Sequence, residues 1–133
     1  SKKEKMMFKI ITLATVMLMS MGSTAGELLN CELQQHNEGK VTGTSFQVEA
    51  TDNPHGSLFM FKADQFEGVS GFVARLTRED REFVVMNIQS DTSQVASSSH
   101  HEVIAGAKQY FHHQLLLPSR GLGINGVIID CQF

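Results

Sequence analysis

The sequence predicts an all-β fold, a single antiparallel β-sandwich or small β-barrel that follows an N-terminal signal peptide. Short stretches in which apolar and polar residues alternate recur about every dozen residues, which is the pattern of half-buried strands. Turn-forming residues separate these stretches, and connections this short favour antiparallel neighbours. The composition, 41% hydrophobic and 19% charged, is that of a globular protein, and 133 residues suffice for one domain.

The first 25 residues have the three parts of a secretory signal peptide. Four lysines lie within the first nine residues, an apolar run covers residues 10–19, and Ser23 and Ala25 form a small-residue cleavage site. The apolar run is shorter than the roughly 20 residues that span a bilayer, so we expect cleavage and no stable membrane insertion afterwards. The prediction is a signal peptide over residues 1–25, a single β domain over residues 26–133, and a periplasmic or secreted location.

The expected domain is acidic, which bears on its partners. Residues 26–133 hold seven lysines and arginines against thirteen acids, a formal charge of −6. A domain of this charge repels phosphate groups. The balance argues against nucleic acid or an anionic membrane surface as the partner, and it leaves the ligand unspecified.

Five alternating stretches lie between residues 29 and 89. The expected strands are Leu29–Gln35, Val41–Ala50, Ser57–Ala63, Val69–Arg78 and Glu82–Gln89. Pro54 and Gly56 mark the strongest turn signal, between the second and third of them. On the third strand, Leu58 and Met60 lie on the face opposite to two phenylalanines, so both of its faces are apolar.

The last expected strand, Gly126–Phe133, carries one of the two cysteines. Cys131 in this strand and Cys31 in the first strand both fall on the apolar face. Two inward cysteines on the first and last strands of an exported domain predict a disulfide, which requires Cα atoms within about 7 Å. Strands lying side by side would close a barrel, and strands lying face to face would join two sheets. The sequence leaves both arrangements open.

Residues 100–117 are compatible with two local structures. As a helix, they would begin with a capping box formed by Ser99 and Glu102. As a hairpin, they would turn at Gly106 and Ala107, with glycine at the position that a type II′ turn requires. The β-rich surroundings favour the hairpin.

Four of the six histidines form two adjacent pairs in this segment. The expected hairpin register places His100 opposite His113, and it places His101 opposite His112. Cross-strand partners have Cβ atoms about 5 Å apart, which would allow two imidazoles and the nearby Glu102 to share a zinc or copper ion. Since structural zinc usually takes four protein ligands and each face offers two histidines, solvent-exposed polar residues are the favoured interpretation.

No motif in the sequence predicts catalysis. The nucleophile-elbow pattern G-x-S-x-G is absent, and the G-x-G-x-x-G at residues 121–126 precedes only seven residues, which form a strand rather than a helix. We therefore expect a non-catalytic binding module for another protein, a surface glycan or a small apolar ligand. A metal-binding protein that uses the histidine pairs and a small extracytoplasmic hydrolase are the alternatives.

Overall fold

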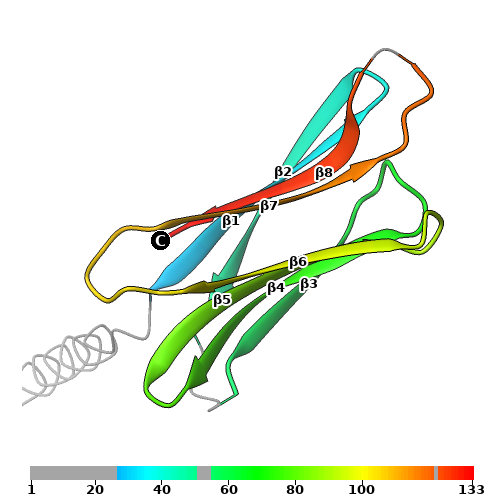
Figure 1. Cartoon of the computed structure of the whole chain (residues 1–133). Coiled ribbons are helices and arrows are strands. Elements are labelled where there is room, and N and C mark those ends of the chain that lie inside the picture. The colour runs from blue at the N-terminus through cyan, green and yellow to red at the C-terminus, as the bar shows by residue number, and fades with distance from the viewer. Residues whose placement is uncertain (1–26, 51–54, 122) are drawn as a thin grey trace, which may run out of the picture.

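A computed structural model describes residues 27–50, 55–121 and 123–133, and these form two four-stranded antiparallel sheets packed face to face (Figure 1). Sheet I has the strand order β2-β1-β8-β7, and sheet II has the order β3-β4-β5-β6. The predicted all-β fold is confirmed as a β-sandwich. The expected signal peptide, residues 1–25, lies outside the described residues.

Eight strands make up the two sheets, and they include all six that the alternation predicted. Their bounds are β1 Leu28–Asn37, β2 Lys40–Glu49, β3 Ser57–Lys62, β4 Val69–Arg78, β5 Arg81–Ser90, β6 Val95–Glu102, β7 Tyr110–Leu117 and β8 Asn125–Gln132. Two-residue turns join β1 to β2 and β4 to β5. Both central residues of each turn have positive φ, 49° and 85° at Glu38 and Gly39, 52° and 65° at Glu79 and Asp80. This is the type I′ geometry whose twist matches that of paired strands.

The core lies between the sheets and is built from every second residue of the inner strands. The fully buried side chains are Leu29, Val73, Val84, Met86, Ile88, Val127, Ile129 and Cys131. Ring contacts close the two open sides of the sandwich. Phe46 of β2 stacks on Phe59 of β3 with ring centroids 4.2 Å apart, and His101 of β6 lies against Phe111 of β7 at 5.5 Å.

The predicted hairpin between residues 100 and 117 is wrong, and so is the helix. The strand β6 pairs with β5 in sheet II, β7 pairs with β8 in sheet I, and residues 103–109 cross from one sheet to the other (Figure 1). His100 therefore lies opposite Val85 rather than His113, and His112 lies opposite Asp130. Gly106 does have a positive φ of 81°, but its turn lies within the segment that crosses between the sheets. Seven residues readily span the roughly 10 Å between packed sheets.

Cys31 and Cys131 form the predicted disulfide, with Cα atoms 4.0 Å apart. They are directly opposite residues of the neighbouring strands β1 and β8. The expectation that side-by-side strands would close a barrel is wrong. β1 and β8 occupy the middle of sheet I, and β2 and β7 pair on their outer sides as edge strands.

Candidate functional site

The outward side chains of sheet I form rows that run across its strands, because directly opposite residues share a face. The amide row consists of Gln47, Asn30, Gln132 and Tyr110, in strand order from β2 to β7. The acid row, two residues further along each strand, consists of Ser45, Glu32, Asp130 and His112. Each strand thus contributes one side chain to each row.

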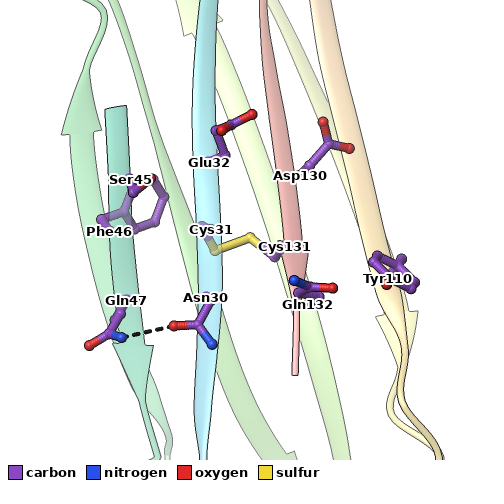
Figure 2. A pocket seen from close by; sticks show the side chains of 10 residues that line it. All are labelled: Asn30, Cys31, Glu32, Ser45, Phe46, Gln47, Tyr110, Asp130, Cys131 and Gln132. Carbon is purple, nitrogen blue, oxygen red and sulfur yellow. Dashed lines mark hydrogen bonds between the residues drawn. A yellow bond between two sulfur atoms is a disulfide. The ribbon is translucent and has the colours of Figure 1, made fainter. Parts of the chain in front are cut away.

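A shallow furrow of about 750 Å³ lies between the two rows (Figure 2). Its walls are the amide row and the first three residues of the acid row. Its floor is formed by Phe46, Cys31 and Cys131, whose side chains belong to the core-facing side of the sheet. The disulfide therefore ties the two central strands together directly beneath the furrow.

Hydrogen bonds along and across the strands hold the polar walls in place. In the amide row, the Nε2 of Gln47 donates to the Oδ1 of Asn30 at 2.8 Å (Figure 2). In the acid row, Glu32 accepts a hydrogen bond from Gln34 at 2.9 Å, and Asp130 lies 2.5 Å from the Nδ1 of His112. That contact with Asp130 raises the pKa of His112, which favours an imidazolium that donates to the carboxylate.

Two carboxylates face each other in the wall of the furrow. Glu32 and Asp130 are directly opposite residues of β1 and β8, and like charges in this position destabilise a sheet. No lysine or arginine is among the described residues that line the furrow. The contact with His112 offsets part of the charge of Asp130, so Glu32 carries the less compensated negative charge in the furrow.

Tyr110 forms the end of the furrow at the edge strand β7. The residue is 77% exposed, and the neighbouring Phe111 fills the core position instead. In Figure 2 the tyrosine lies at the far end from Gln47, with Asn30 and Gln132 between them. It offers a ligand an aromatic face together with a hydroxyl group.

The structure disperses the residues predicted to bind a metal. His100 and Glu102 lie on the outer face of sheet II, where His100 stacks on Phe83 and Glu102 pairs with Arg81. His112 lies on the outer face of sheet I, 2.5 Å from Asp130. Throughout the described ranges, no three His, Cys, Asp or Glu side chains are placed to hold one metal ion. Zinc or copper binding stays a prediction from the sequence without a converged set of ligands.

His101 and His113, the remaining two predicted ligands, point inward at the side where β6 meets β7. The Nε2 of His113 lies 2.8 Å from the backbone oxygen of Ser97 and covers the edge of β6. Burial, reinforced by the neighbouring His113 and His100, lowers the pKa of His101. Both side chains therefore act as structural groups that close the sandwich.

The furrow was missed at the level of sequence, although one signal was present. In antiparallel strands, a disulfide between directly opposite cysteines also places Asn30 opposite Gln132 and Glu32 opposite Asp130. That register places two of the four residues in each row. Tyr110 does not follow, because the predicted hairpin put its strand beside β6.

Comparison with protein-family models, with curated proteins and with solved structures finds no match to this chain. The chemistry of the furrow is therefore the basis for assigning a function.

Proposed function

We propose that this chain is an extracytoplasmic binding module that recognises a hydroxyl-rich glycan in the furrow of sheet I. The observation that carries the proposal is the furrow itself. Amide and carboxylate side chains from three strands line it, and an exposed tyrosine, Tyr110, closes one end.

The polar groups of the walls match the hydrogen-bonding pattern of sugars. Asn30, Gln47 and Gln132 each offer a carbonyl acceptor and an amide donor, and Glu32 and Asp130 offer acceptors. Sugar hydroxyls donate and accept at once, so they pair with both kinds of group. Since several of these side chains are already held by hydrogen bonds, less conformational entropy is lost on binding.

The other partner classes fit the furrow less well. A small apolar ligand would leave the amides and carboxylates of the walls without partners, which costs binding energy. A protein interface is usually centred on buried apolar or aromatic anchors, and Tyr110 at the rim is the one such group that lines the furrow with its outward side chain. In the described part of the chain, His113 bonds to the backbone carbonyl of Ser97 and not to a serine hydroxyl. This contact does not activate a serine nucleophile, so it does not support a hydrolase.

A location outside the cytoplasm is part of this proposal. The disulfide supports it, because such bonds persist in oxidising compartments, and the basic and apolar pattern of residues 1–25 supports it as well. In the described ranges, no helix has the length and apolar character needed to span a bilayer.

The test is a titration of the purified, disulfide-intact protein against a panel of neutral polysaccharides, followed by calorimetry. We expect at least one to bind, and we expect Asn30→Ala and Gln132→Ala to weaken it about tenfold each, or about 1.4 kcal/mol. The matched control is Asn87→Ala, which truncates an amide on the outer face of sheet II. Absence of binding to every polysaccharide, or equal losses in the control, would overturn the proposal.

A further inference from the structure

The furrow runs across the strands of sheet I rather than along them. The amide row takes one residue from each strand at the same level, from Gln47 on β2 to Tyr110 on β7. Neighbouring strands lie about 4.8 Å apart, so four strands span roughly 14 Å. The furrow therefore crosses four strands and has a polar group at every strand.

The spacing of these polar groups is rigid. Backbone ladders join all four strands, and the disulfide locks the two central ones beneath the furrow. The backbone positions of Gln47, Asn30 and Gln132 therefore repeat at the strand spacing, and the Gln47 amide reaches across to the Asn30 amide at 2.8 Å. A ligand that contacts a side chain from every strand must itself repeat at about that interval.

An extended glycan chain has this repeat. One pyranose ring adds to an extended, equatorially linked chain a length close to the strand spacing of about 4.8 Å. Building on the proposed function, we propose that the ligand is an unbranched, uncharged glycan that lies across the strands. It places about one sugar unit on each step between strands and stacks its last unit on Tyr110. The four strands offer three such steps.

The surroundings of the furrow exclude the nearest competitors. Glu32 and Asp130 repel sugars that carry carboxylate or sulfate groups. His112 offsets part of the charge of Asp130, and no described lysine or arginine lines the furrow to offset that of Glu32. A peptide that adds as a strand needs free backbone groups, but the backbones of β1 and β8 are paired on both sides. A chain crossing the strands meets side chains only, which suits a glycan.

The test uses unbranched oligosaccharides of one to six units, measured by calorimetry with the wild-type protein. Three neutral series are the β-1,4-linked oligomers of glucose, N-acetylglucosamine and mannose, and oligogalacturonates form the charged series. In at least one neutral series, we expect affinity to rise at least tenfold from one unit to three and to change less than twofold from four units to six. Oligogalacturonates of equal length are expected not to bind.

Variants at the two ends of the furrow test the direction of the chain. Tyr110→Ala is expected to reduce the affinity for the trimer about tenfold. Tyr110→Phe is expected to bind the trimer about as tightly as wild type, because stacking needs the ring alone. Gln47→Ala is expected to weaken the trimer but not the dimer. Gln89→Ala, on the outer face of sheet II, is the matched control for the glutamine.

The possible failures are distinguishable. Affinity that is independent of length, that keeps rising to six units, or that is equal for oligogalacturonates would overturn the transverse, uncharged chain and leave glycan binding in place. If no neutral oligomer or polysaccharide binds, the proposed function fails and this inference fails with it.

Discussion

Two histidines show how residues of one type receive opposite properties from their surroundings. His112, on the outer face of sheet I, has its pKa raised by the hydrogen bond to Asp130. His101, turned into the sandwich against Phe111, has its pKa lowered, chiefly by burial. Each of these histidines belongs to an adjacent pair in the sequence. Neighbours in a strand point to opposite faces, so each pair is divided between the outer face and the interior.

The bond between His112 and Asp130 makes a pH-dependent contribution to stability. Because the pKa of His112 is raised on folding, the contribution is fully present below its ordinary pKa of about 6.5 and disappears as the pH rises through the folded-state value. For a half-exposed pair we expect about 0.5 kcal/mol. The melting temperature of His112→Gln should therefore lie below wild type at pH 5.5 and approach it by pH 9.

A double-mutant cycle with Asp130→Asn isolates this pair from other effects of the two substitutions. The coupling energy between positions 112 and 130 is expected at pH 5.5 and is expected to vanish at pH 9. A coupling that is independent of pH, or that grows in alkali, would contradict the assignment.

The opposed carboxylates in the furrow make a second prediction at this scale. Replacing Glu32 with glutamine removes the repulsion from Asp130, so the free energy of unfolding should rise by about 0.5 kcal/mol at pH 7. Denaturant titration measures this gain. Glu49→Gln is the control, since Glu49 lies on the same face opposite Leu28 and relieves no such repulsion. An equal gain in both variants would contradict the argument.

At the scale of elements, local alternation predicted strands well and their partners poorly. All six predicted strands are present, because a period of two decides which side of a strand is apolar whatever lies beside it. The pairing of β6 and β7 was mispredicted. A glycine turn and a crossing loop make similar demands on the backbone, so residues 103–109 alone do not distinguish a hairpin from a change of sheet.

The candidate site depends on pairing more than on the strands themselves. Asn30 and Glu32 are recognisable in the sequence as outward residues of the first strand, and the disulfide register aligns them with Gln132 and Asp130. The contribution of Tyr110 depends on β7 pairing with β8. The furrow therefore exists only when three separate segments of the chain are assembled in order.

At the scale of the whole molecule, the disulfide closes nearly the entire domain into one loop. It joins residues 100 positions apart, and restricting the unfolded chain to this extent contributes about 4 kcal/mol, with the value dependent on the model of the unfolded state. We expect the double variant Cys31→Ser, Cys131→Ser to melt roughly 20 °C below wild type.

Calorimetric scans of the oxidised, reduced and double-serine proteins check this prediction. Reduction should reproduce the loss in the double variant and should leave that variant itself unchanged. A reduced wild type that melts with the oxidised protein would show that the bond contributes nothing to stability.

The two outer faces of the sandwich differ in character. Sheet I presents the polar furrow, whereas sheet II exposes Leu58 and Met60, which are 60% and 73% accessible. The sequence indicated that both faces of this strand are apolar. Within the described residues the outer face is open, because sheet II packs against sheet I through its inner face and the phenylalanines alone reach the core.

By itself, the sequence determined the β class, the positions of six strands, the inward and outward faces, and the bond between Cys31 and Cys131. These follow from local alternation and from the chemistry of two cysteines. The tertiary structure alone decided that the sheets stay open as a sandwich and that β6 and β7 belong to different sheets. It also decided that two polar rows lie on either side of a furrow. Those outcomes depend on contacts between segments far apart in the chain, which no local pattern encodes.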